Sequence, residues 1–145
     1  MIVEAAVRHV QAQHNGAVRF DPRVMGSIPT RFDHERDVLI APTPTRVPLA
    51  REERDREAIL VRLGVQRERI EDYTAADSAR SACRERERYG AAILGLTRRS
   101  ADGASWRIRV YLVAAESRQV YDLVLSQVGR DWVVIGEEEL LRVSS

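Results

Sequence analysis

Three histidines and the carboxylates beside them are the residues whose types could support acid–base or metal chemistry in this chain. His9 and His14 are five residues apart, so on a helix they would point about 140° away from each other. They therefore do not form the i, i+4 pair of a zinc-binding helix. His34 is flanked by Asp33 and Glu35, and a carboxylate beside an imidazole can fix its tautomer for proton transfer. We take His34 and Asp33 as candidate acid–base residues, against the alternative of an ordinary polar loop.

Residues for nucleophilic, cofactor and phosphate chemistry are scarce. Cys83 is the only cysteine, and it stands among arginines with no histidine beside it, so we expect it to serve packing. All 23 basic residues are arginine. The absence of lysine excludes Schiff-base enzymes, pyridoxal-phosphate enzymes, P-loop proteins and protein kinases, because each needs a lysine amine. The sequence predicts neither a cofactor nor a metal site.

Charge and hydropathy also limit the partners. The net charge is +1, and 22 acidic residues are interleaved with the arginines, so no basic block is available for nucleic acid. Residues 1–14 lack the apolar core of a signal peptide, and no segment is long enough to span a bilayer. We expect a soluble chain, with the cytoplasm favoured, and a secreted or periplasmic location if a signal segment was removed. The arginine-rich, lysine-free composition is typical of a GC-rich bacterial genome.

The first half of the chain predicts two helices separated by a loop-rich segment. Apolar residues three and four apart predict a helix that ends near Gly16, and a second helix is expected over 49–63. Shorter predictions are a strand at 17–20 that stops at Asp21 and Pro22, a strand at 37–41, a strand near 69–73, and a helix or charged loop at 78–88.

The last third predicts an antiparallel strand meander. The four expected strands are 91–97, 106–112, 120–128 and a last strand that begins at 132–135 and continues at 140–143, past Gly136 and three glutamates. Their connections are too short for parallel crossovers. We therefore predict a single α+β domain over 1–145, with N-terminal helices packed on a curved antiparallel sheet of four to six strands. This order of elements resembles the cone-shaped fold of nuclear-transport-factor-like and cystatin-like domains, and the resemblance is one of topology alone.

One face of the meander is the second candidate site. Alternation along 106–112 separates an apolar face from a polar one. The polar residues assigned to this site are Arg107, Arg109, Tyr111, Tyr121 and Asp122, with the glutamates 137–139 beside them. One interpretation is a solvated face with Arg–Glu pairs, each contributing under about 1 kcal/mol. The other is a pocket in which Arg107 and Arg109 bind a carboxylate that Tyr111 or Tyr121 orients.

Strand 120–128 has apolar residues on both faces. Val120, Val124 and Val128 are on one face, and Leu123 and Leu125 are on the other. Such a strand must be covered on both sides, by helices and by a curled sheet or a partner subunit. We therefore favour a non-catalytic ligand-binding or protein-interaction module that dimerises through its sheet. The alternative is a small acid–base hydrolase or isomerase with a cone pocket and His34, Asp33 or Asp122 as catalytic groups.

Overall fold

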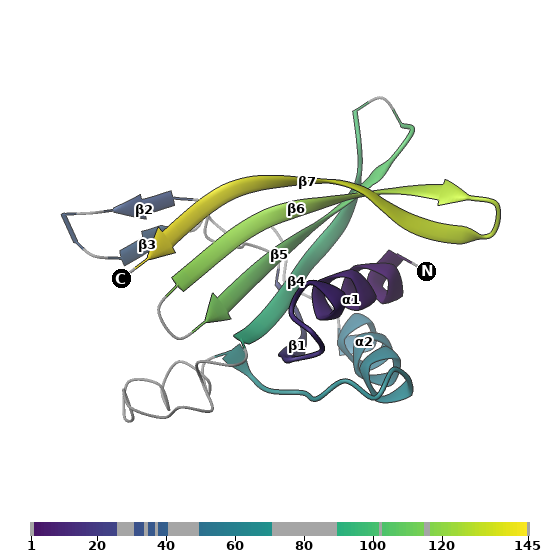
Figure 1. The fold of residues 1–145 in the computed structure, drawn as a ribbon, viewed down its shortest axis with the longest axis horizontal. Coiled ribbons are helices and arrows are strands. Elements are labelled where there is room, and N and C mark those ends of the chain that lie inside the picture. The colour runs from purple at the N-terminus through teal and green to yellow at the C-terminus, as the bar shows by residue number, and fades with distance from the viewer. Residues whose placement is uncertain are drawn as a thin grey trace.

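The computed structural model describes residues 2–25, 31–33, 35–36, 38–40, 50–70, 90–101, 103–114 and 117–144. Within these residues, two helices lie on one face of a curved five-stranded sheet (Figure 1). The elements in chain order are α1 (Ile2–Gln13), β1 (Val18–Met25), β2 (Arg31–Asp33), β3 (Val38–Ile40), α2 (Ala50–Arg62), β4 (Gly90–Arg99), β5 (Trp106–Ala114), β6 (Ser117–Val128) and β7 (Asp131–Ser144). The predicted α+β class, with helices first and a meander last, is confirmed.

Both predicted helices form. The apolar stripe of α1 buries Ala6, Val7 and Val10. The helix ends where Asn15 and Gly16 adopt positive φ angles of 54° and 77°, and the Gly16 amide donates to the Gln11 carbonyl at 2.7 Å. Residues in this left-handed backbone conformation are typical of helix C-termini, and here they turn the chain toward β1.

The α2 helix also matches its expected bounds closely. Glu52 and Glu53 lie in its first turn and Arg62 in its last, as the helix dipole favours. Ile59 and Leu60 are buried, whereas Val61 is exposed. The apolar side of α2 therefore packs toward the sheet, and its charged side faces solvent.

The first strand differs from its prediction. We expected it to stop at Pro22, but β1 continues to Met25. Its register against β4 shifts between Asp21 and Val24, and it lies at the end of the strand order β1-β4-β5-β6-β7. A proline is tolerated at a bulge of an edge strand because the missing N–H breaks few ladder bonds. β1 pairs parallel with β4, and the other neighbours in this sheet are antiparallel.

The C-terminal meander is present, and its last strand continues past Gly136 as expected. Residues 131–144 form one strand that includes Gly136 and the three glutamates. Gly136 lies opposite Val124, and the glutamates pair with residues 121–123 of β6. Cross-strand pairing thus overrides the low strand propensity of glycine and glutamate. β2 and β3 form a separate two-stranded ladder.

The core has two parts, one on each face of the sheet. The larger part joins α1 and α2 to the face that we call the inner face, and includes Val7, Phe20, Ile108, Leu123 and Leu125. A smaller cluster on the opposite, outer face contains Ile70, Ala91, Ile93, Tyr111, Val113 and Val120. Burial of β6 on both faces, expected from its sequence, is confirmed for Val120 and Leu123, both 0% exposed, but it is wrong for Val128 at the end of the strand, which is 62% exposed.

Some predictions fall on residues that are not described. These are the helix or loop at 78–88, Cys83 within it, His34, and the part of the 69–73 strand beyond Ile70. Neither described helix is long and apolar enough to cross a membrane.

Candidate functional site

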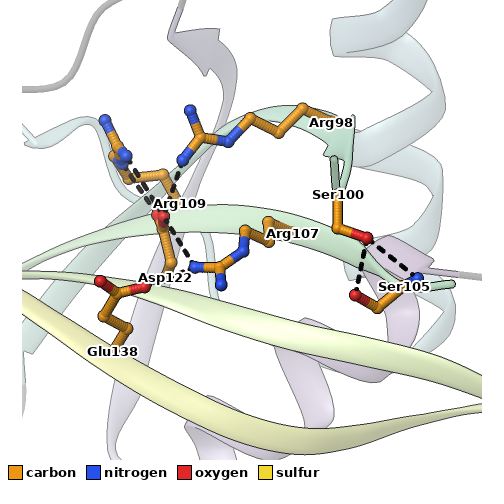
Figure 2. A network of polar contacts seen from close by, with 7 residues as sticks. All are labelled: Arg98, Ser100, Ser105, Arg107, Arg109, Asp122 and Glu138. Atoms are coloured by element: carbon orange, nitrogen blue, oxygen red, sulfur yellow. Dashed lines mark hydrogen bonds and ion pairs between the residues drawn. The ribbon is translucent and has the colours of Figure 1, made fainter. Parts of the chain in front are cut away.

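Asp122 is the centre of a cluster of charged residues on the outer face of the sheet (Figure 2). Its side chain is almost fully buried, and its residue is 1% exposed. Arg109 donates from Nε to Oδ1 at 2.8 Å and from Nη2 to Oδ2 at 3.2 Å. Arg98 donates from Nη2 to Oδ2 at 3.0 Å, and Nη1 of Arg107 lies 3.8 Å from the same oxygen. We call Arg98, Arg107 and Arg109 the arginine cluster.

Strand register brings these side chains together. Arg109 lies opposite Asp122 in the β5–β6 pair, and Arg98 lies opposite Arg107 in the β4–β5 pair. Two arginines directly across a ladder repel each other. A carboxylate between them removes this repulsion, and Asp122 occupies that position. At the nearby β4–β5 turn, the Ser105 amide and hydroxyl both bond to Oγ of Ser100, at 3.2 and 3.0 Å (Figure 2).

The charges of the cluster set the ionisation state of Asp122. Arg107 also donates to Oε2 of Glu138 at 2.5 Å, so in the ion pairs between described residues three guanidinium groups contact two carboxylates. Burial alone would raise the pKa of Asp122. The hydrogen bond and charge of Arg109, with those of Arg98, outweigh burial and hold this pKa below its usual value. Asp122 is therefore an anion at neutral pH, which makes it a poor proton donor.

The arginine side chains reach solvent to different extents. Arg98 is 60% exposed, Arg107 32% and Arg109 24%, whereas the Asp122 side chain is 2% exposed. Each guanidinium offers five N–H groups in a planar fork. The site thus has a buried carboxylate at its floor and arginine side chains at its rim. The rim is the part that a ligand can reach.

The two tyrosines predicted for this site lie on different faces. Tyr111 shares the outer face with Arg107 and Arg109 and is buried. Burial raises the pKa of Tyr111, and the charge and hydrogen bond of Arg118 partly offset that rise. Tyr121 lies on the inner face, because adjacent residues of a strand point to opposite sides and Asp122 faces outward. The structure therefore joins Asp122 to the predicted arginines and separates Tyr121 from them.

Tyr121 has a second unusual feature. Its hydroxyl is buried and has no hydrogen-bond partner among the described residues. Burial raises the pKa of Tyr121, and the nearby charge of Glu137 raises it further. The phenol therefore stays protonated at neutral pH.

A histidine–carboxylate pair that the sequence did not indicate joins α1 to β7. Nε2 of His9 lies 2.6 Å from Oε1 of Glu137, and the Gln13 amide donates to the same oxygen. Both partners are partly exposed, with His9 at 30% and Glu137 at 40%. Sequence reasoning assigned His9 to the surface of a helix, because its partner is far away in the chain.

The predicted acid–base residues are not brought together in the described structure. Oδ1 of Asp33 accepts the backbone amides of Glu35 and Arg36 at 3.0 and 3.2 Å, which is a turn-capping role. Asp122 is held by arginines, and His34 lies outside the described residues. Among the described residues, no group of three histidine, cysteine or acidic side chains could hold a metal ion.

An open cavity of about 700 Å³ lies between α1, β1 and the chain after α2. Apolar side chains of Val7, Val18, Leu63 and Val65 line it, and Arg8 and Arg19 also contribute. Its volume suits a small molecule. However, none of the residues predicted for a site lines this cavity, and the arginine cluster belongs to other strands.

Comparison of the chain with protein-family models, with curated proteins and with solved structures finds no match.

Proposed function

We propose that this domain is a non-catalytic binding module whose arginine cluster receives a carboxylate group of a partner molecule. The supporting observation is the convergence of Arg98, Arg107 and Arg109 on one buried carboxylate, that of Asp122, with Glu138 as a second, exposed partner of Arg107. Arginine forks match carboxylate geometry in a bidentate manner. The partly exposed arginine side chains are the feature that a partner carboxylate would complement.

The buried Asp122 supports this proposal through preorganisation. It holds Arg109 by two hydrogen bonds and Arg98 by one, so these flexible side chains are already ordered. A ligand that meets ordered side chains loses less conformational entropy on binding. Arg98, the most exposed of the three, would make the first contact because it needs the least desolvation.

The proposed role is non-catalytic because the described cluster has no group that transfers protons near neutral pH. Arginine stays protonated, and the lowered pKa of Asp122 keeps it ionised. Such a set can bind and orient an anion, but it cannot exchange protons with one near neutral pH.

The test is a binding measurement with a pentaglutamate peptide, and a pentaglutamine peptide as the uncharged control. Titration calorimetry at low ionic strength is expected to detect binding of pentaglutamate alone. Arg98→Gln should weaken it by about tenfold or more, the equivalent of about one charged hydrogen bond.

The matched control is Arg99→Gln, at the next position of the same strand. Arg99 is also exposed, but its Nε donates to the Gly103 carbonyl at 3.0 Å and takes no part in the cluster. Arg99→Gln should bind the peptide as the wild type does. Equal loss in both variants, or equal binding of both peptides by the wild type, would disprove the proposal.

A further inference from the structure

The end of the β6–β7 hairpin carries an exposed apolar patch. Among the described residues, four large hydrophobic side chains are exposed, and three of them belong to this hairpin. Val128 is 62% exposed, Val133 42% and Ile135 60%. Val133 and Ile135 lie on the outer face, because Trp132 and Val134 beside them pack against the inner-face core. Apolar residues gathered in this way mark an interaction surface.

The patch coincides with a length of the β7 edge that pairs with no other strand of the described residues. β7 is the last strand in the order β1-β4-β5-β6-β7. β2 contacts β7, and it lies beside the C-terminal end of β7, away from the hairpin tip (Figure 1). Charged residues commonly protect edge strands from pairing with other chains. In β7 the three glutamates begin only after Gly136, so residues 132–135 have no such protection.

We propose that a second copy of this chain pairs with β7 at this edge, antiparallel and about a two-fold axis at Val133. β7 carries one extra residue against β6 between the Leu125 and Val124 pairs, and this residue is Ile135. Because Ile135 has no partner in this register, an axis at Val133 places Trp132 beside Val134 of the second copy and Asp131 beside its Gly136. All of these pairs join residues on the same face of the combined sheet, as antiparallel pairing requires.

Charge complementarity selects a second copy as the occupant and also selects the register. The same axis brings Arg130 of each copy beside Glu137 of the other. Arg130 is exposed and forms no ion pair with the described residues. Moving the axis one step toward Val134 would place Asp131 opposite Glu138, and like charges across a ladder repel. The axis at Val133 avoids acid–acid contact and repeats the favourable pair twice, as an isologous interface does.

This interface is separate from the proposed anion site. It uses the edge and tip of the hairpin, whereas the arginine cluster lies on β4 and β5 around Asp122. The two proposals can therefore fail independently.

The test is sedimentation equilibrium across a wide range of protein concentration. The wild type should change reversibly from monomer to dimer, and no larger species should form because two-fold pairing closes the assembly. Val133→Lys places two cations at the axis and should weaken the dimer by about tenfold or more. Val61→Lys is the matched control, because Val61 is 58% exposed and lies on α2, away from the hairpin.

A charge exchange tests the register. Arg130→Glu should weaken the dimer, and the double variant Arg130→Glu with Glu137→Arg should restore it. Three outcomes would overturn the proposal: a wild type that stays monomeric throughout, equal weakening by Val61→Lys and Val133→Lys, and failure of the double variant to regain affinity. Pentaglutamate binding measured on the Val133→Lys monomer then reports on the arginine cluster alone.

Discussion

Arg109 and Asp122 lie directly opposite each other on β5 and β6, and the guanidinium of Arg109 donates two hydrogen bonds to the carboxylate, at 2.8 and 3.2 Å. This pair forms the floor of the arginine cluster, because Asp122 is 1% exposed while Arg109 still reaches solvent. The carboxylate thus neutralises part of the cluster and orders it at the same time. Its removal should affect both stability and anion binding.

Asp122→Asn is expected to lower the free energy of unfolding by about 2 kcal/mol, less than the 3–5 kcal/mol typical of a fully buried pair because the arginines are partly hydrated. The cost arises because three guanidinium groups lose their central counterion. Urea denaturation at neutral pH measures it. Glu139→Gln is the control, because its pair with Arg142 is exposed and should contribute under about 1 kcal/mol. A larger loss in Glu139→Gln than in Asp122→Asn would contradict this account.

Acid should destabilise the wild type through Asp122. Burial opposes ionisation, but Arg109 and Arg98 outweigh it and hold the folded-state pKa below the usual value of 3.8. A lowered folded pKa stabilises the fold above the unfolded-state pKa, and that stability is lost as pH falls through the folded pKa. The wild type should therefore lose stability below about pH 4, where unfolded carboxylates begin to take up protons.

The Asp122→Asn variant tests this pH dependence. Its unfolding free energy should fall less steeply in acid, so the two curves converge as the pH decreases. A residual slope should persist because Asp21 also has a lowered pKa. Burial raises that pKa, but the hydrogen bonds from Arg23 and from the Ile70 amide outweigh burial. Parallel curves for wild type and variant, measured by urea denaturation at each pH, would refute the assignment.

Local patterns predicted most of the fold, and long-range pairing decided the rest. The apolar stripe of α1 and the alternation in β5 are local, and both elements formed as expected. The extension of β1 through Pro22 depends on its edge position and on its parallel partner β4, which the local sequence does not specify. The last strand was expected to continue past Gly136, and in β7 it does so with β6 paired beside it along its whole length.

The candidate site was predictable to the same degree. Period-two alternation placed Arg107 and Arg109 on one face, and the structure confirms that placement. Arg98 was missed because a bulge between Leu94 and Thr97 determines which face it occupies. Tyr121 was grouped with Asp122, although adjacent strand residues point to opposite faces, so alternation alone could have separated them. The His9–Glu137 pair required the packing of α1 on β7.

Arg56 is expected to be essential for stability although it takes no part in the proposed site. It is 7% exposed, and it donates to the carbonyls of Leu94 and Gly95, both at 2.8 Å, where β4 is irregular. Burial lowers the pKa of Arg56 to about 10, and Glu52 partly offsets this, so the side chain remains charged at neutral pH. Arg56→Met would remove the charged hydrogen bonds to these two carbonyls, at a cost of about 2–4 kcal/mol.

Thermal and urea unfolding of Arg56→Met should be compared with Arg54→Met on the same helix. Arg54 is exposed, so its replacement should change stability by less than about 0.5 kcal/mol. Similar stability of the two variants would show that the carbonyls of Leu94 and Gly95 find other donors.

We expect glycine to be required at position 90, at the start of β4, because β5 lies too close for a side chain there. A Cβ atom at this position would lie 2.7 Å from the backbone oxygen of Val113, and backbone cannot move aside as a flexible side chain can. Gly90→Ala should therefore cost about 1–3 kcal/mol, the range for overpacking of a buried site. Gly136→Ala is the matched control within the same sheet, because its Cβ would meet only Cβ of Val124 at 4.0 Å. Urea denaturation at low protein concentration should separate the two variants, and equal stability would mean that β4 shifts against β5 without cost.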